Sequence, residues 1–564
     1  MEQNTRKLKI QSEIATMKNV IKDPILLTTI IIVLSIVTLF IVIPMLRILG
    51  GSFLSDGKLT TQYYQAIFTK AYNRLIIKNT LKLGLTVSLL ATTIGFLFAY
   101  ASSYLRIKSK RLFDAIAILP IISPPFLIAL SAILLFGRTG LITRGILGIQ
   151  DAEIYGFKGL VLVQTLTFFP VAYLVLSGLL KQIDPSVEEA ARSLGASRGS
   201  VFRTVTVPLM APGIANAALL IFIQSVADFG NPMVIGGNYT TMAAQIYLQG
   251  IGSLDMAGAT ALAVILLIIS VSAFVIQKYY VGKKSYITVT GKVSRARQLI
   301  DEPHIVKPVH IAVVAISCLV GLMYILVPIG SFIKLWGVNY SLTLDHFKYV
   351  MDLGIKPILD TTLLALIATP ITGVLAMVIA FLTVRRRFPG RNYMEFTTML
   401  AIAIPGTVIG LGYVLTYNTG PLVLTGTAAI LVIAFMVRSM PVGIRSGIAA
   451  LQQIDPSIEE AASILGASSK KVFTSVTLPM IRPAFFSGLV NSFARSMTLV
   501  STVIFLVSAR WNLLTVAIMA QIDQGKIGVA SVYSTLLIII VATVISVIRW
   551  FVSRFGVSAD EFEF

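Results

Sequence analysis

Four ionisable side chains interrupt long apolar runs of this sequence. Asp228 lies in one run, and Arg438, Arg445 and Arg495 lie in two others. A charge at the centre of a membrane-spanning helix costs roughly 2.5–3.5 kcal/mol, so such a side chain usually faces a water-filled cavity or a partner. Guanidiniums offer forked donors, which suit an oxyanion. They would repel a bare trivalent cation.

Three of these side chains and one neutral residue form a candidate solute path, which consists of Asp228, Gln224, Arg438 and Arg495. Gln224 is included because it is the repeat equivalent of Arg495, so the two halves differ there. A structural alternative stays open, in which the arginines bond helix carbonyls or pair with Asp228 to hold the bundle. Arg445 lies near the end of its run and can extend to the interface.

Other chemistry finds little support in the sequence. Cys318 is the only cysteine, which excludes an internal disulfide or a thiolate cluster, and the three histidines are scattered. A phosphate-binding loop needs Gly-x-x-x-x-Gly-Lys followed by Ser or Thr, and none of the Gly-Lys pairs has that sequel. We expect no catalytic residue, no metal and no cofactor in this chain.

The most informative pattern is a segment that occurs twice. Residues 183–208 match residues 454–479 at 17 of 26 positions, with no gap in either copy. Asp184 can cap a helix that starts at Pro185, and Gly195 can end that helix in a left-handed conformation. The second copy repeats these features at Asp455, Pro456 and Gly466. Small alanines in both copies leave room for another backbone, and two like copies suggest a two-fold partner.

Composition indicates what positions these segments. The chain has 564 residues, of which 56% are hydrophobic and only 13% charged. Soluble domains carry nearer 25% charged residues, so an ordinary soluble enzyme is excluded. The net charge of +21 suggests basic residues on the cytoplasmic side of a membrane rather than nucleic acid binding.

The apolar runs predict an all-α membrane protein with about twelve transmembrane helices. The expected spans lie near 25–46, 83–104, 115–136, 159–180, 212–235, 257–277, 309–332, 360–384, 396–417, 427–449, 483–507 and 529–550. Six spans fall in each half. An even number means that both copies face the same way, as a parallel repeat with a pseudo-two-fold axis along the membrane normal.

We expect three parts along the chain. The first repeat covers 1–285 with the repeated loop at 182–210, a basic cytoplasmic linker covers 286–308, and the second repeat covers 309–564 with its loop at 453–481. Weaker matches in the same order support this division, with Asn79-Thr80 against Asp360-Thr361 and Pro124 against Pro405.

Lys and Arg are about twice as frequent in the segments on the same side of the membrane as the N-terminus as in the segments on the opposite side. This bias predicts that both termini are cytoplasmic. The clusters Arg106–Arg111, Lys278–Arg297 and Arg385–Arg391 carry most of this bias. We interpret them as topology anchors rather than ligand sites. Both repeated loops then lie on the cytoplasmic side.

The repeated segment resembles the EAA signature of permease subunits of bacterial ABC importers. In that signature Glu-Ala-Ala is followed after three residues by Gly and after twelve more by Pro. The residues that carry the resemblance are Glu189, Ala190, Ala191, Gly195 and Pro208, and Glu460, Ala461, Ala462, Gly466 and Pro479. The resemblance covers essentially the whole chain as two fused copies of the type I importer fold.

This resemblance implies that each loop forms a coupling helix in a cleft of a separate ATPase homodimer, which uses ATP and Mg. It also implies a bacterial inner-membrane location and an external solute-binding protein. We expect no nucleic acid partner, and the lipid bilayer surrounds the spans. The chain itself would not be an enzyme.

The solute stays open between two classes. Val226-Ala227-Asp228-Phe229-Gly230 and Val503–Ser508 resemble ferric-iron-type permeases, which favours ferric iron, free or chelated. The two mid-depth arginines suit a phosphonate or an anionic ferric chelate. The resemblance to related fused permeases keeps a phosphonate or a phosphorylated sugar as the alternative solute. A secondary transporter is a remote alternative, because only Asp228 could serve as an ion-coupling carboxylate at mid-depth.

Overall fold

The computed structural model describes residues 23–554 except 56–57, 125, 151 and 282–296. Its residues divide into two compact units. Unit 1 contains the described residues of Met1–Gly51, Lys356–Leu514 and Ile539–Phe564, and unit 2 contains those of Ser52–Ile355 and Thr515–Ile538. Residues 286–296 of the predicted linker lie outside the described residues.

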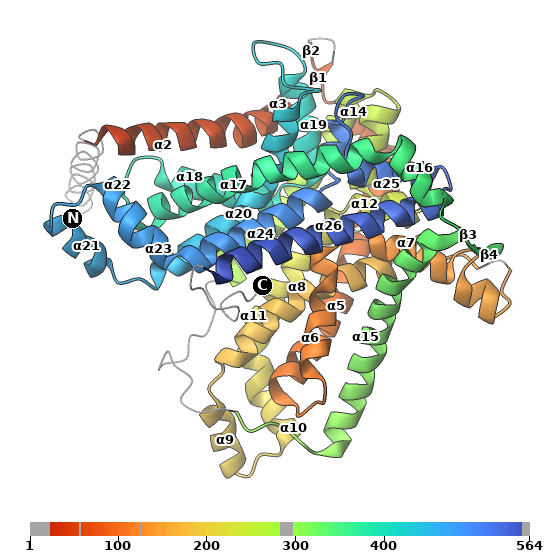
Figure 1. The fold of residues 1–564 in the computed structure, drawn as a ribbon, viewed down its shortest axis with the longest axis horizontal. Coiled ribbons are helices and arrows are strands. Elements are labelled where there is room, and N and C mark those ends of the chain that lie inside the picture. The colour runs from red at the N-terminus through yellow and green to blue at the C-terminus, as the bar shows by residue number, and fades with distance from the viewer. Residues whose placement is uncertain (1–22, 56–57, 125, 151, 282–296, 555–564) are drawn as a thin grey trace. The chain divides into compact units, whose positions relative to one another are not determined.

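Unit 2 is almost entirely helical. Its elements are β1 (Leu54–Ser55), β2 (Lys58–Leu59), α4 (Gln62–Thr69), α5 (Ala71–Tyr104), α6 (Lys110–Ile122), α7 (Leu127–Phe136), η2 (Leu141–Ile146), α8 (Phe157–Gln182), α9 (Pro185–Ser193), α10 (Arg198–Val201), η3 (Phe202–Thr206), α11 (Val207–Val226), α12 (Gly230–Ile235), α13 (Met242–Tyr247), η4 (Leu248–Gly252), α14 (Met256–Val275), η5 (Ile276–Val281), α15 (Pro303–Phe332), β3 (Ile333–Leu335), β4 (Asn339–Leu342), α16 (Asp345–Leu353) and α25 (Leu514–Asp523) (Figure 1). The strands form two antiparallel hairpins, β1 with β2 and β3 with β4.

Unit 1 is also helical. Its elements are α2 (Pro24–Val37), η1 (Thr38–Val42), α3 (Ile43–Gly51), α17 (Ile355–Arg385), α18 (Arg391–Ala403), α19 (Gly406–Tyr417), α20 (Ala428–Gln452), α21 (Pro456–Ile464), α22 (Ser469–Val472), η7 (Phe473–Thr477), α23 (Leu478–Met480), α24 (Arg482–Thr498) and η8 (Val503–Phe505). Helix α26 (Ile527–Ser553) contributes to both units.

Each compact unit includes the first span of the other sequence half. In unit 1, α3 packs on α19, and Tyr413 donates a hydrogen bond to the carbonyl of Phe40 (2.9 Å). In unit 2, α15 packs on α7, and Trp336 donates to the carbonyl of Leu134 (2.8 Å). The compact units therefore differ from the two halves of the sequence. The proposed boundaries of the halves rest only on the sequence repeat.

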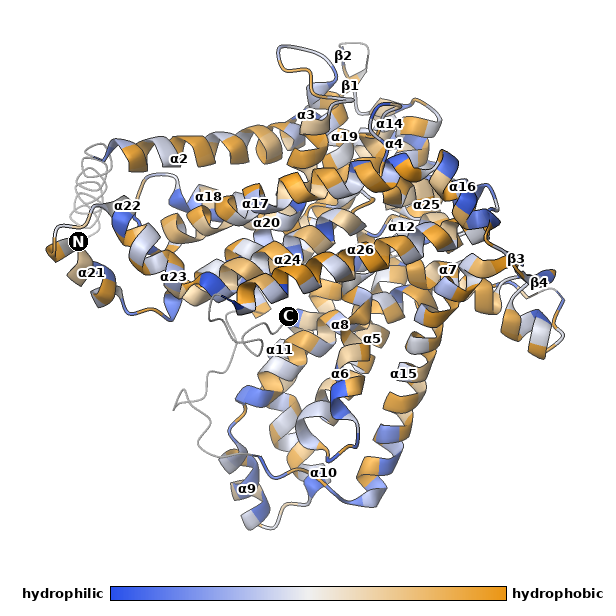
Figure 2. Cartoon of the chain, in the orientation of Figure 1, coloured by the Kyte–Doolittle hydropathy of each residue, from blue (hydrophilic) through white to orange (hydrophobic). Residues whose placement is uncertain are grey.

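Helices long and apolar enough to cross a membrane dominate the described part of the chain. Ten such helices are present there, and the bent pair α18–α19 would make an eleventh. The chain is thus a helical membrane protein, and about twelve spans remain compatible with this count. Figure 2 shows apolar residues along α15, α17 and α26, with polar residues gathered at α9, α10 and α16.

Three of the predicted spans are divided into shorter helices in the structure. The 115–136 span divides into α6 and α7, and the 396–417 span bends by 114° between α18 and α19. Pro124 and Pro405 lie at these breaks, because proline lacks an amide hydrogen and disfavours helix at the preceding residue. The 212–235 span divides at Asp228, whose carboxylate lies beside the start of α12.

Other boundaries differ in position. The span predicted at 483–507 ends as a helix at Thr498, and the span predicted from 309 begins at Pro303 inside the expected linker. Small residues bring the long helices close together: a Cβ on Gly95 of α5 would collide with the Cβ of Ala172 of α8. Such close approach is the common way for membrane helices to pack.

Candidate functional site

The repeated loop of the first half, residues 182–210, forms two short helices. Helix α9 starts at Pro185, and the Asp184 carboxylate accepts a hydrogen bond from the Ser186 amide (3.0 Å). Helix α9 ends at Ser193, and Gly195 follows with φ +90°, a conformation that favours glycine. The predicted cap, start and stop of this helix are confirmed.

The repeated loop of the second half, residues 453–481, is built in the same way. Helix α21 covers Pro456–Ile464, and the Ser457 amide donates to Asp455 (2.9 Å). This hydrogen bond holds the pKa of the Asp455 carboxyl below its usual value. Gly466 has φ +85°.

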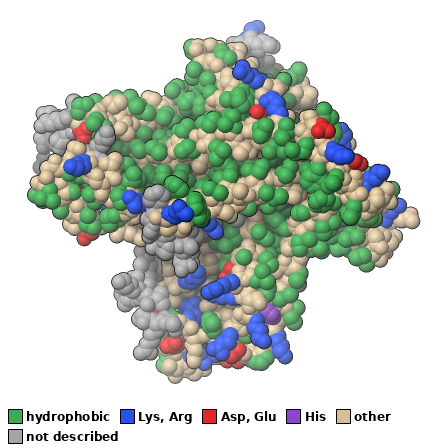
Figure 3. All heavy atoms as spheres, viewed as in Figure 1, with side chains coloured by type: hydrophobic (Ala, Val, Ile, Leu, Met, Phe, Trp, Pro, Cys, Tyr) green, Lys and Arg blue, Asp and Glu red, His purple; other side chains and the backbone are tan. Residues whose placement is uncertain are grey.

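Both loops present apolar side chains to solvent. Leu194 is 90% exposed in the first loop, and Leu465 is 88% exposed in the second. The two leucines are equivalent positions of the two repeats, so both loops carry the same exposed apolar tip. Figure 3 shows Lys and Arg side chains gathered at the end of unit 2 that carries α9 and α10.

The residues of the predicted signature are mostly accessible. Glu189, Ala190, Gly195, Pro208, Glu460, Ala461 and Gly466 are exposed, and Ala191, Ala462 and Pro479 are half-buried. The structure keeps each set together in its own loop. Their contact with an ATPase stays a prediction.

Sequence reasoning missed the glutamate that precedes each signature. The Glu188 carboxylate accepts hydrogen bonds from the hydroxyls of Tyr104 (2.8 Å) and Thr206 (2.7 Å). It also lies 3.5 Å from the guanidinium of Arg297. These contacts connect α9 to the end of α5 and to η3, so Glu188 fixes the root of the first loop.

Glu459 does the same in the second loop. Its carboxylate accepts hydrogen bonds from Arg385 Nε and from the Thr477 hydroxyl, both at 3.0 Å. Arg385 also donates to the carbonyls of Leu451 and Ile454, each at 2.8 Å. The sequence signal for this clamp was available, since both copies contain the additional glutamate before the signature and a threonine at the same spacing after it.

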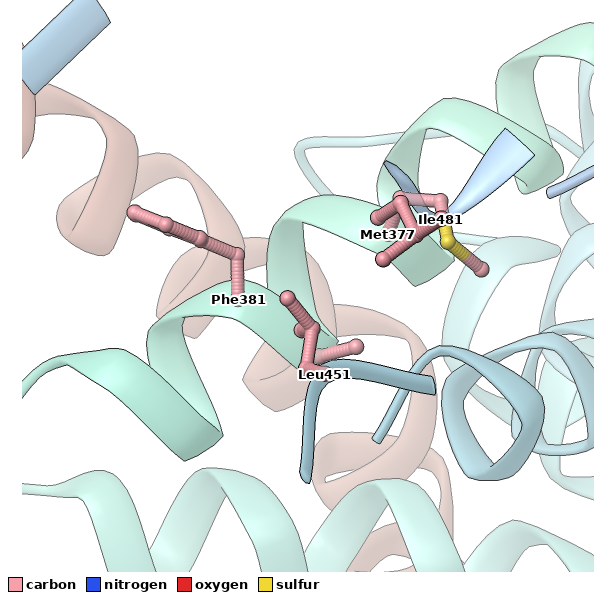
Figure 4. Packing of buried hydrophobic residues seen from close by; sticks show 5 residues of the cluster. Met377, Phe381, Leu451 and Ile481 are labelled. Atoms are coloured by element: carbon pink, nitrogen blue, oxygen red, sulfur yellow. The ribbon is translucent and has the colours of Figure 1, made fainter. Parts of the chain in front are cut away.

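A hydrophobic cluster supports the second clamp. Figure 4 shows Met377 and Phe381 of α17 with Leu451 of α20 and Ile481, all buried. Phe473 of η7 packs edge-on against Phe381, with ring centroids 5.0 Å apart. Packing of this kind attaches the base of the loop to the ends of its own spans.

The candidate path residues lie in different surroundings. In unit 2, buried Asp228 accepts hydrogen bonds from the side-chain amides of Gln164 (2.7 Å) and Asn231 (2.8 Å). The Ser225 hydroxyl donates a hydrogen bond to the side-chain carbonyl of Gln164 (2.5 Å). Gln224 is half-buried. The carboxylate of Asp228 is therefore held by neutral amides within its unit.

The two arginines belong to unit 1. Arg438 donates to the carbonyls of Ala401 (3.0 Å) and Ile404 (2.8 Å), where α18 ends at the bend. It satisfies helix carbonyls, as the structural alternative proposes. Arg495 of α24 is exposed, and no hydrogen bond or ion pair of its guanidinium is found among the described residues. Solute contact by any of these residues stays a prediction.

Comparison with known proteins shows that the chain matches one protein family twice. A family described as "Binding-protein-dependent transport system inner membrane component" matches residues 91–286 and again 371–557. Each match includes one of the repeated loops. The chain therefore contains two copies of one transport domain.

Two curated relatives match most of the chain. A ferric transport system permease protein FbpB of Actinobacillus pleuropneumoniae is 35% identical over 549 residues, covering 95% of this chain and 80% of the relative. A putative ferric transport system permease protein FbpB 1 of Haemophilus influenzae is 37% identical over 507 residues, covering 88% and 80%. Among solved structures, a bacterial ABC transporter that imports alginate aligns with 48% of this chain and 99% of its own, at 16% identity and a TM-score of 0.40.

Proposed function

The chain belongs to the family of binding-protein-dependent transport system inner membrane components, and we propose that it is a fused double permease of an ATP-driven importer of ferric iron. In this proposal it forms the translocation path of a multi-pass inner-membrane transporter, and ATP is hydrolysed with Mg by a separate ATPase homodimer. An external solute-binding protein delivers the iron, free or chelated.

The observation that carries the proposal is the pair of matching loops. Each loop has an exposed apolar tip and a root clamped by a largely buried glutamate to the ends of its own spans. A rigid connection of this kind can transmit the movement of a bound ATPase into the bundle, because packed interfaces move as bodies rather than deform. Two copies suit the two subunits of a symmetric motor.

The identity of the solute rests on the relatives. Two proteins whose names specify ferric transport are 35% and 37% identical to this chain over most of its length. The excess of Lys and Arg in alternate segments supports cytoplasmic termini and cytoplasmic loops.

A second candidate is favoured by Arg495. An exposed guanidinium in a membrane helix can bind an oxyanion, so a phosphonate or a phosphorylated sugar is the alternative solute. Equilibrium binding to the purified solute-binding protein separates the two. Binding of ferric iron with no binding of methylphosphonate supports the proposal, and the reverse result overturns it.

The coupling role is tested in vesicles that contain the permease, its ATPase and its binding protein. Glu189→Lys together with Glu460→Lys alters two exposed side chains, so the bundle should remain folded. We expect uptake of radioactive ferric iron to fall at least tenfold while the thermal unfolding temperature of the permease stays unchanged. Lys108→Glu, an exposed charge change in a neighbouring connection, is the control and should leave uptake intact. Normal uptake by the double variant would contradict the proposal.

A further inference from the structure

The two loop clamps use the same acceptors but obtain their guanidinium from different parts of the chain. In the second half, Arg385 binds Glu459 and the carbonyls of Leu451 and Ile454. In the first half, Arg297 lies by Glu188 and donates to the carbonyls of Leu180 and Ile183, each at 3.0 Å. All three acceptors are equivalent positions of the two repeats.

The two arginines are not repeat equivalents. Arg385 is at the end of α17, and the match of Asn79-Thr80 with Asp360-Thr361 places Tyr104 of α5 at the corresponding position. Tyr104 cannot supply a guanidinium. Instead its hydroxyl donates to Glu188, and Arg297 stacks over its ring at 3.8 Å from the centroid. Arg297 comes from the chain just before α15, the first helix of the second half.

Further contacts hold the segment 297–302 against the end of α5 and against the first loop. The Ile300 amide donates to the carbonyl of Tyr104 (2.8 Å), and the Arg106 amide donates to the carbonyl of Ile300 (3.0 Å). Glu302 forms an ion pair with Arg198 of α10 (2.8 Å). The segment therefore bridges the end of α5 and the second short helix of the loop.

We propose that residues 297–302 form a strap by which the second half positions the coupling loop of the first half, with Arg297 as the positioning residue. The inference rests on the proposed function of the loops. Fusion of two permease copies provides a connection that one copy alone lacks, and here that connection supplies the charge missing at position 104. The Arg297 side chain is largely buried and paired, so its removal leaves the Glu188 carboxylate without its cation.

Hydrogen exchange of the permease alone in lipid nanodiscs tests the strap without an ATPase. In Arg297→Ala, amide exchange in α9 should rise about tenfold or more, while exchange in α21 stays unchanged. Adding Tyr104→Arg returns a guanidinium to the position that Arg385 has in the second half, and should restore slow exchange in α9. Lys108→Ala, an exposed neighbour, is the control.

If Tyr104→Arg disturbs folding, exchanging the two charges of the Arg198–Glu302 ion pair provides a second test of the strap. Arg198→Glu should loosen the loop, and Arg198→Glu with Glu302→Arg should restore it, because both side chains are partly exposed. Unchanged exchange in α9 of Arg297→Ala would overturn the strap. An equal rise in α9 and α21 would also overturn it, since that result indicates general destabilisation.

The ratio of iron transported to ATP hydrolysed separates the strap from the function on which it rests. We expect Arg297→Ala to lower this ratio and Tyr104→Arg to restore it. A restored exchange pattern with an unaltered ratio in both variants would support the strap and contradict the coupling role of the loop.

Discussion

Glu188 and Glu459 are equivalent residues of the two repeats and occupy the same place in their loops. The side chain of each is 13% exposed, and each accepts a hydrogen bond from the equivalent threonine, Thr206 or Thr477. Each also faces an arginine whose guanidinium bonds two carbonyls at the end of the preceding span. The mechanical unit is thus a clamped loop that occurs twice.

Removing either clamp should loosen one loop only. Glu459→Ala leaves the Arg385 guanidinium without its carboxylate in a largely buried position, which costs about 3 kcal/mol. We expect the local unfolding free energy of α21, measured by hydrogen exchange, to fall by about this amount. Glu460→Ala, at the exposed neighbour, should change it little. Equal effects of the two variants would contradict the clamp.

The glycines that end the loop helices should tolerate asparagine better than alanine. Gly195 and Gly466 have φ +90° and +85°, and no atom lies within 4 Å of a Cβ built on either. The cost of substitution is therefore backbone strain of about 1–2 kcal/mol rather than a steric clash. Asparagine adopts this conformation more readily. Coupled transport should fall more in Gly195→Ala with Gly466→Ala than in the two asparagine variants, and the opposite order would refute the strain argument.

Arg438 and Arg495 should respond differently to the same substitution. Arg438→Gln withdraws two donors from the carbonyls at the α18–α19 bend and should lower the thermal unfolding temperature. Arg495→Gln changes an exposed side chain and should leave that temperature unchanged. If Arg495 lines the path, its variant lowers uptake of an anionic ferric chelate more than uptake of uncomplexed iron. Equal uptake of both by Arg495→Gln would remove this residue from the path.

Asp228 should tolerate asparagine far better than alanine. Both side-chain amide donors reach the same carboxylate oxygen, so the side-chain oxygen of an asparagine can replace it, and only the long bond from the Asn231 backbone amide to the other oxygen (3.5 Å) is lost. Asp228→Ala leaves two buried amides unpaired, at about 1–3 kcal/mol each. Thermal unfolding should rank the wild type and Asp228→Asn close together, with Asp228→Ala well below. Loss of iron uptake in a stable Asp228→Asn would identify the negative charge as part of the path.

Much of the fold could be predicted from sequence, because each span must satisfy its own backbone in lipid. The breaks at Pro124 and Pro405 had a signal in the repeated prolines, but an apolar run looks the same whether or not the chain turns within it. The inclusion of α2, η1 and α3 with second-half helices in unit 1 could not be predicted, because it depends on contacts between distant segments such as the hydrogen bond from Tyr413 to the carbonyl of Phe40.

The candidate site was found in part. The repeated loops, their caps and their glycine stops follow from local chemistry, and the structure contains them. Glu188 and Glu459 were missed because burial is not visible in a run of two glutamates. Arg297 was interpreted as one of many basic anchors, since its partners at 180, 183 and 188 lie far away in the sequence.

Cysteine cross-linking to the ATPase tests the coupling role of the loops most directly. Cys318 is the only cysteine, so Cys318→Ser gives a clean background for Leu194→Cys or Leu465→Cys at the exposed tips. We predict that both variants form a disulfide with single cysteines placed in the ATPase surface. Leu342→Cys, which is 81% exposed on β4 and predicted to lie outside, should form none. Cross-links from Leu342→Cys, with none from either loop tip, would contradict the proposed function.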